Sequence, residues 1–142
     1  MSIHLAEAAA TEQWGEAFAR ELTCGDVVLL FGPLGAGKTT LVRGLARGLG
    51  FSGTVVSPTF TILEVYDGTW PIYHFDFYRV ADAAELRAVD PREYYDAGVT
   101  FIEWPDRIRD WWPAARIELT LRYEKDARVL STLRLEADAA GH

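Results

Sequence analysis

One short segment restricts the fold of this chain more than any other. Residues 32–39, GPLGAGKT, match the pattern G-x-x-x-x-G-K-[ST] without a gap. Residues 27–31, VVLLF, precede it as a continuous apolar run, which is typical of a strand buried on both faces of a parallel sheet. After it, Leu41, Leu45 and Leu49 recur on one face of a predicted helix. A buried strand, a glycine-rich loop and a helix in this order open a nucleotide-binding α/β fold.

Residues 32–39 are called the phosphate loop below, because each fixed position has a chemical purpose. Gly32, Gly35 and Gly37 allow the backbone to turn so that successive N–H groups point at phosphate oxygens. The following helix directs the positive end of its dipole to the same place. We expect Lys38 to lie along the β- and γ-phosphates and the Thr39 hydroxyl to ligate Mg²⁺. A glycine-rich turn that matches by chance is the competing interpretation, and the flanking strand and helix argue against it.

A phosphate loop needs a second magnesium ligand, usually an acid at the end of a buried strand. Glu103 ends the apolar run VTFIE, and Asp76 lies within YHFDFYR. Position favours Glu103, because ligands bind at the carboxyl edge of such sheets. Asp76 would then hold a magnesium-bound water or orient the attacking water. The structural alternatives are a surface acid paired with Arg79 and a helix-capping carboxylate before Pro105.

Several other residues are ambiguous when taken singly. His74 is more often a structural histidine with satisfied hydrogen bonds than a catalyst. Arg79 is either a stabiliser of transition-state charge or an ordinary ion-pair partner. Residues 57–61, SPTFT, form a hydroxyl-rich loop that could contact the γ-phosphate and change shape when it leaves, or simply a turn before a strand.

Apolar periodicity predicts further helices and strands on either side of the phosphate loop. Trp14, Phe18 and Leu22 recur at helical spacing and indicate a helix over residues 12–22. Two strands are expected over about 60–66 and 71–78, and a buried one over 99–103.

The remaining segments predict short helices and a hairpin. Asp82 and Asp90 each resemble the N-cap of a short helix, and Pro105 begins a further helix. Alternating residues 117–123 and a last strand near 128–136 predict a C-terminal antiparallel β-hairpin.

Composition and charge exclude several classes of protein. The chain has 142 residues, 49% hydrophobic and 25% charged, as expected for one globular domain. Its net charge of −7 argues against a protein that grips nucleic acid alone, because phosphate binding needs a basic face. The single Cys24 cannot form an internal disulfide and has no activating neighbour in the sequence. No apolar run approaches the roughly 18 residues of a membrane span, so we expect a cytoplasmic protein with no membrane partner.

Four segments follow one another over residues 32–107: GPLGAGKTT, SPTFT, HFDFYR and FIEWPDR. In this order they resemble the TsaE (YjeE) family of bacterial P-loop ATPases, which take part in making threonylcarbamoyladenosine at position 37 of tRNA. The phosphate loop is shared by a very large superfamily, whereas HFDFYR and FIEWP combined with SPTFT are much more specific. With the helix before and the hairpin after, the resemblance covers nearly the whole chain.

The resemblance implies a P-loop NTPase fold with a mixed parallel and antiparallel sheet flanked by helices, in a single domain over residues 1–142. It implies ATP and Mg²⁺ as cofactors. It also implies weak ATP hydrolysis by the isolated chain and activity in an assembly with TsaD and TsaB. ATP turnover would reset that complex between catalytic cycles. The tRNA would then be met only indirectly, through the complex, which agrees with the acidic net charge.

The resemblance further implies roles for individual residues. The phosphates would be bound by a continuous run: Gly35, Ala36, Gly37, Lys38, Thr39 and Thr40. Thr39 and Glu103 would hold Mg²⁺, and Asp76 falls on the family's hydrolysis-linked acid.

Two more assignments concern the SPTFT segment and the N-terminal region. Ser57 and Thr59 fall on the family's switch-like loop. Thr11, just before the predicted first helix, falls where the family contacts the nucleotide base, and a simple helix N-cap is the alternative.

Two other functions use the same loop. A small-molecule kinase would phosphorylate a metabolite and would need a basic lid, for which only Arg87 and Arg92 are plausible. A nucleotide-responsive binding module would use its ATP state to control docking through residues 57–61, with negligible turnover. Substituting Asp76→Asn should separate the ATPase from the module.

Overall fold

The computed structural model describes residues 2–33, 35–55, 62–80, 83–125 and 127–137. The predicted residues Ser57, Thr59 and Asp82 lie outside these ranges. Seven strands are present in this part of the chain: β1 Ser2–Leu5, β2 Val27–Phe31, β3 Leu63–Asp67, β4 Pro71–Asp76, β5 Val99–Glu103, β6 Arg116–Glu124 and β7 Ala127–Leu135. The α-helices are α1 Ala8–Phe18, α2 Lys38–Gly48 and α3 Ala83–Ala88. Shorter 3₁₀ helices are η1 Ala19–Glu21, η2 Pro91–Glu93 and η3 Pro105–Trp111.

The strands form one sheet in the order β1-β7-β6-β2-β5-β4-β3. β2 lies between β5 and β6 and is parallel to both, and β4 is parallel to β5. The pairs β1–β7, β6–β7 and β3–β4 are antiparallel. The central position of β2 explains its sequence, because a strand covered on both faces reads as a continuous apolar run. The predicted mixed α/β sheet with a C-terminal hairpin is confirmed.

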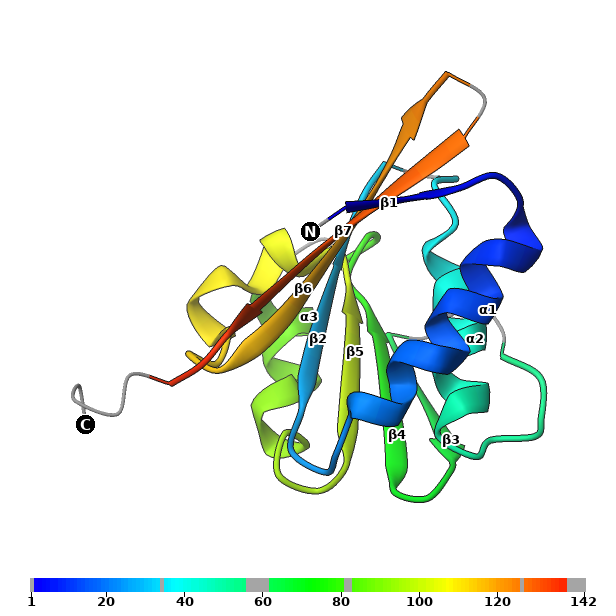
Figure 1. The fold of residues 1–142 in the computed structure, drawn as a ribbon. Helices are drawn as coiled ribbons and strands as arrows, with labels where there is room; N and C mark the ends of the chain where they lie inside the picture. Colours follow the sequence, from blue (N-terminus) through cyan, green and yellow to red (C-terminus); the bar gives the residue numbers. More distant parts are fainter. Residues whose placement is uncertain (1, 34, 56–61, 81–82, 126, 138–142) are drawn as a thin grey trace.

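Helices cover both faces of the sheet. α1 and α2 lie together on one face (Figure 1), over a buried cluster that includes Leu30, Leu41 and Phe101. A second buried cluster on the other face includes Leu29, Phe75 and Ile102, with aromatic side chains such as Tyr94 packed against it. Leu29 and Leu30 therefore point to opposite faces, as the two-residue period of a strand requires.

Glycines bring α1 and α2 unusually close. A Cβ atom added at Gly44 would lie 2.1 Å from the Glu12 carbonyl oxygen, and one added at Gly48 would lie 2.4 Å from the Glu16 carbonyl oxygen. From the other helix, a Cβ atom at Gly15 would lie 2.9 Å from the Leu41 carbonyl oxygen. The missing side chains let the two backbones touch, which holds α1 firmly against the helix that follows the phosphate loop.

The N-terminal region differs from its prediction. The helix predicted over 12–22 begins at Ala8 and ends at Phe18, and a 3₁₀ turn follows. Three successive alanines at 8–10 extend it toward the N-terminus, since alanine is the strongest helix former. Thr11 therefore lies inside α1 rather than just before it, and Glu7 is the N-cap residue. Strand β1 had no predicted counterpart, because its pairing with β7 spans almost the whole chain.

The segment after β5 also differs from its prediction. The helix expected from Pro105 is a 3₁₀ helix, interrupted at Ile108 by non-helical backbone angles. At the other expected short helix, the Asp90 side chain accepts a hydrogen bond from the Arg92 N–H and Pro91 stands in the first turn, as predicted. No helix in the described residues is long and apolar enough to cross a membrane.

Candidate nucleotide-binding site

The phosphate loop joins the end of β2 to the start of α2, in the strand–loop–helix context that the sequence predicts. Gly32 has a φ of 147°, and a Cβ atom there would lie 2.6 Å from the Leu121 carbonyl oxygen of β6. Gly37, at the N-cap of α2, has a φ of 101°. Both values lie in a region that residues with a side chain rarely adopt. The loop glycines are thus required by the backbone path and by the close approach of β6.

Lys38 is the first residue of α2, and its side chain returns into the loop. The ammonium Nζ donates a hydrogen bond to the Gly32 carbonyl oxygen at 2.7 Å. It also lies 3.7 Å from the centroid of the Trp104 ring, where a cation is attracted to the ring face. Burial lowers the pKa of Lys38, and the nearby carboxylates of Glu103, Asp76 and Asp106 oppose that shift. The structure therefore brings the loop lysine near the two predicted acids.

The two acids lie side by side at the carboxyl edge of the sheet. Asp76 ends β4 and Glu103 ends β5, and the two residues are register partners in that parallel pair. Their side chains therefore project from the same face, the face that α1 and α2 cover, since Leu30 is the register partner of Glu103 on β2. The acids predicted from separate segments are neighbours in space.

Asp76 has a partly buried carboxyl group. Its Oδ1 accepts a hydrogen bond from the Tyr78 N–H at 2.9 Å. Burial raises the pKa of Asp76, the charge of Glu103 raises it further, and the Tyr78 N–H together with His74 and Lys38 opposes the rise. Arg79 is exposed, and no ion pair joins it to Asp76 in the described part of the chain.

Glu103 is almost completely buried, with 3% of its surface exposed. Its Oε2 lies 2.6 Å from Nε2 of His74, and the other ring nitrogen of His74 lies 3.0 Å from the Tyr66 hydroxyl. His74 thus has both ring nitrogens satisfied, as a structural histidine should. The sequence analysis did not predict these two partners of His74, although Tyr66 and His74 stand on neighbouring strands of a predicted antiparallel pair.

Glu103 does not cap the helix that follows. The N-cap position belongs to Trp104, which has a φ of 57° and makes no side-chain capping hydrogen bond. A left-handed backbone is strained for an aromatic residue, and such strain is found most often at functional sites. The turn sends the indole back under Lys38, where it also packs on Tyr78 with ring centroids 4.7 Å apart.

Thr11, expected near the nucleotide base, is fully buried within α1. Its hydroxyl Oγ1 has no hydrogen-bond partner in the described part of the structure. The helix N-cap interpretation is wrong, because the residue occupies the second turn of its helix. A buried hydroxyl without a partner costs free energy unless a ligand or water satisfies it.

Two residues of the C-terminal hairpin reach the loop without having been predicted. The Tyr123 hydroxyl donates to the Gly35 carbonyl oxygen. The Arg128 side chain packs beside Gly37, where its Nε would lie 3.1 Å from an added Cβ atom. Tyr123 and Arg128 are register partners on β6 and β7. Only the β6–β2 pairing brings them here, so no local sequence signal could have identified them.

The remaining predicted residues occupy the loop and the first turn of α2. Ala36 is buried, Gly35 is exposed, and Thr39 and Thr40 are partly buried. No group of three or more His, Cys, Asp or Glu residues with metal-binding geometry occurs among the described residues. The available donors are the Thr39 hydroxyl and the carboxylates of Glu103 and Asp76, a small oxygen set. Such a set fits Mg²⁺, which takes few protein ligands and keeps waters and phosphate oxygens.

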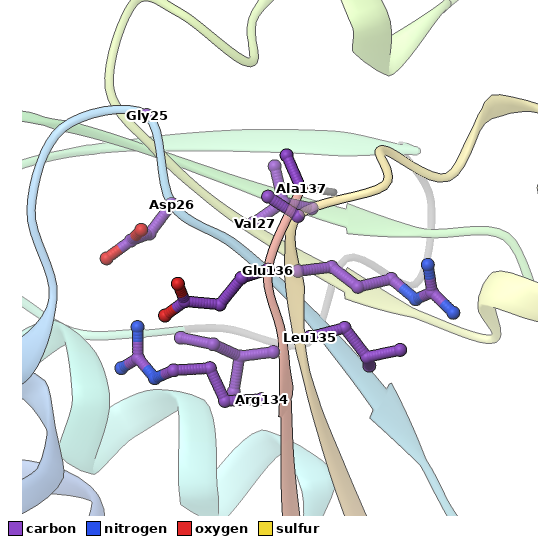
Figure 2. Close-up of a pocket in the computed structure, with 10 residues that line it drawn as sticks. Gly25, Asp26, Val27, Arg134, Leu135, Glu136 and Ala137 are labelled. Atoms are coloured by element: carbon purple, nitrogen blue, oxygen red, sulfur yellow. The ribbon is translucent and has the colours of Figure 1, made fainter. Parts of the chain in front are cut away.

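A pocket of about 320 Å³ lies elsewhere (Figure 2), where β2 and β6 begin and β7 ends. Asp26, Arg134 and Glu136 line it, and none of the predicted site residues does. Because parallel sheets bind ligands at the carboxyl ends of their strands, this pocket is on the wrong edge for the phosphate loop.

Comparison with known proteins identifies relatives over most of the chain. The family model described as threonylcarbamoyl adenosine biosynthesis protein TsaE matches residues 5–130. The Synechocystis TsaE protein is 46% identical over 114 residues, which are 76% of this chain and 72% of that protein. The Treponema pallidum TsaE protein is 42% identical over 82% of this chain and 87% of its own length. The crystal structure of Bacillus subtilis YdiB aligns with a TM-score of 0.81 at 31% identity, covering 96% of this chain and 86% of that one.

Proposed function

The chain belongs to the TsaE family of tRNA threonylcarbamoyladenosine biosynthesis proteins, and from that membership and the geometry of the site we propose that it is an ATP-hydrolysing accessory protein. Its task would be to support threonylcarbamoylation of adenosine 37 in tRNA by acting on a complex of TsaD and TsaB. One observation carries the proposal: Lys38, Asp76 and Glu103 converge beside the glycine loop at the carboxyl edge of the sheet.

Binding of ATP is assigned to the loop and the first turn of α2. The backbone N–H groups of residues 35–40 would hold the phosphates, with the N-terminal end of α2 directed at them. Lys38 would exchange its hydrogen bond to Gly32 for one to a phosphate oxygen. Thr39 and Glu103 would hold Mg²⁺, which when bound neutralises charge on the phosphates. Thr11, with its unsatisfied hydroxyl, is proposed to contact the base.

Hydrolysis is assigned to Asp76. The Tyr78 N–H holds one carboxylate oxygen and leaves the other for the attacking water. A raised pKa brings an acid closer to the range in which it exchanges protons with water. Lys38 would stabilise negative charge on the γ-phosphate as the bond to the leaving group breaks. Ser57 and Thr59 are proposed as the loop that senses the γ-phosphate.

A metabolite kinase is less well supported. Arg92, one of two arginines considered for a basic lid, forms an ion pair with Asp90 at 2.7 Å and lies over the Trp111 ring. It is therefore held in place by its neighbours.

A net charge of −7 fits a cytoplasmic accessory protein that meets tRNA through its protein partners.

Steady-state ATP turnover tests the proposal. The purified chain should hydrolyse ATP slowly alone and faster with TsaD and TsaB, and Lys38→Ala should abolish turnover in both conditions. The Arg87→Ala variant, changed at an exposed position of α3, is the control and should match the wild type. Turnover that the partners do not change, or that survives in Lys38→Ala, would refute the proposal.

A further inference from the structure

We propose that His74, itself held by Tyr66, is a positioning residue that fixes the carboxylate of Glu103 for its role as a magnesium ligand. The inference rests on the proposed function, because it assigns a purpose to a contact of the same site. It adds two residues, neither of which belongs to the phosphate loop or to the pair of acids.

The three side chains form a continuous buried row across β3, β4 and β5. The Tyr66 hydroxyl lies 3.0 Å from Nδ1 of His74, and Nε2 of His74 lies 2.6 Å from Oε2 of Glu103. Tyr66 is 5% exposed, His74 is 0% exposed and Glu103 is 3% exposed. Solvent therefore does not compete for these hydrogen bonds, and a low local dielectric strengthens each of them.

Hydrogen-bond chemistry determines which group donates and which accepts at each contact in the row. An ionised carboxylate only accepts hydrogen bonds, so Nε2 of His74 must carry the proton and donate it to Oε2 of Glu103. In the neutral ring Nδ1 is then an acceptor, and the Tyr66 hydroxyl donates to it. Tyr66 thus selects the ring tautomer that Glu103 needs.

The row is anchored at its far end. The Tyr66 ring stacks on Phe51 with centroids 4.9 Å apart, and the Phe51 N–H donates to the Ala46 carbonyl oxygen of α2. One carboxylate oxygen of Glu103 is therefore fixed through a chain of contacts that leads back to the helix after the phosphate loop. The other oxygen, Oε1, would then be the one that meets the cation.

A single rigid orientation matters because Mg²⁺ tolerates little departure from octahedral geometry. Groups that orient a metal ligand through hydrogen bonds typically change metal affinity by about 10- to 100-fold when they are removed. A histidine present only for packing would not have this effect.

Matched variants separate positioning from packing. His74→Leu removes the donor, whereas His74→Gln keeps an N–H that reaches the same place. Tyr66→Phe removes only the hydroxyl. Thr100→Val is the control, because it deletes a buried hydroxyl without a described partner from β5, on the face opposite Glu103.

Calorimetry would measure the affinity for Mg²⁺ in the presence of ADP, and chemical denaturation would measure stability. We expect affinity for Mg²⁺ to fall about 10- to 100-fold in His74→Leu and about 10-fold in Tyr66→Phe. We expect His74→Gln and Thr100→Val to stay within about threefold of the wild type. Unchanged affinity in Tyr66→Phe, or equal losses in His74→Gln and His74→Leu, would overturn the inference.

A second measurement needs no variant and no nucleotide. The ¹⁵N chemical shifts of the His74 ring in the wild-type protein report which nitrogen carries the proton. We expect the proton on Nε2, and a proton on Nδ1 alone would overturn the inference while leaving the proposed function intact. Wild-type protein that binds ADP with no response to Mg²⁺ would instead overturn both.

Discussion

Asp76 and Glu103 are neighbours on adjacent strands, yet their surroundings differ. Glu103 is almost fully buried and is held by a histidine. Asp76 is only partly buried and accepts one backbone hydrogen bond. A fixed, buried carboxylate suits a metal ligand, and a more accessible one with a raised pKa suits a residue that handles water. The two environments therefore support the two different roles proposed for these acids.

Asp76→Asn should lower turnover and raise stability at the same time. Loss of a group that handles protons typically lowers kcat by about 10²- to 10⁴-fold. The pKa of Asp76 is higher in the folded protein than in the unfolded chain, so the ionised carboxylate lowers the free energy of unfolding at neutral pH. That penalty grows as the pH rises from the unfolded pKa to the folded one.

Denaturant unfolding at two pH values would check this prediction. The variant should be more stable than the wild type at pH 7, because the asparagine amide oxygen still accepts from Tyr78. The difference should vanish at a pH below the ordinary range of an aspartate. A variant less stable than the wild type at pH 7 would contradict the argument.

Gly32 and Gly35 provide a matched pair within the loop. Both have a positive φ, but an added Cβ atom meets the Leu121 carbonyl oxygen at Gly32 and nothing within 4 Å at Gly35. Gly35→Ala should cost about 1–2 kcal/mol of backbone strain, whereas Gly32→Ala adds a clash with β6 and should cost about 1–3 kcal/mol more. Thermal unfolding of both variants would measure the difference, and equal losses would show that β6 moves aside freely.

At the scale of elements, the contact between α1 and α2 holds the N-terminal helix against the helix that follows the phosphate loop. Gly15, Gly44 and Gly48 line this contact and admit the opposing backbone. Buried Thr11 lies one turn before Gly15 on α1, the residue that approaches Leu41 of α2. Part of the proposed site is therefore built by helix packing rather than by the loop.

Gly44→Ala should destabilise the protein, because its methyl group would meet the Glu12 backbone at 2.1 Å and push α1 away. Overpacking of this kind costs about 1–3 kcal/mol. The comparison is Arg47→Ala, which removes a partly exposed ion pair to Glu12 in the same interface and should cost about 1 kcal/mol. Equilibrium denaturation distinguishes the two, and a smaller loss in Gly44→Ala would contradict the packing argument.

At the scale of the whole molecule, charge limits how the chain can meet tRNA. Fourteen basic residues oppose 21 acidic ones, and several arginines are paired with acids, including Arg47, Arg92 and Arg116. Binding to a polyanion depends on unpaired basic side chains that displace counterions. This charge balance favours the proposed route, in which the chain meets tRNA through protein partners.

The isolated chain should bind tRNA very weakly at physiological salt, with a dissociation constant no tighter than about 10⁻⁴ M. Fluorescence anisotropy with labelled tRNA would measure this, first for the chain alone and then with TsaD and TsaB present. Micromolar binding by the chain alone would contradict the prediction and point to a basic surface that net charge conceals.

The sequence by itself determined those elements and site residues that depend only on short contiguous segments of the chain. Short contiguous segments predict the phosphate loop, the buried strand before it and the acid at the end of β5. Glycines in a tight loop and a continuous apolar run indicate the same local structure whatever the rest of the fold. The hairpin of β6 and β7 was predictable for the same reason. The expected helix over 12–22 was misplaced because its apolar stripe was visible while the helix-forming alanines before it were not counted.

Only the tertiary structure decided which distant residues meet. The pairing of β1 with β7, the contact of Tyr123 with the phosphate loop, and the link from His74 to Glu103 all join segments far apart in sequence. Their side chains carry no periodic signal, since each contact depends on strand order and register within the sheet. The motifs therefore predicted which residues gather at the candidate site, whereas the side chains that contact them became evident only in the assembled sheet.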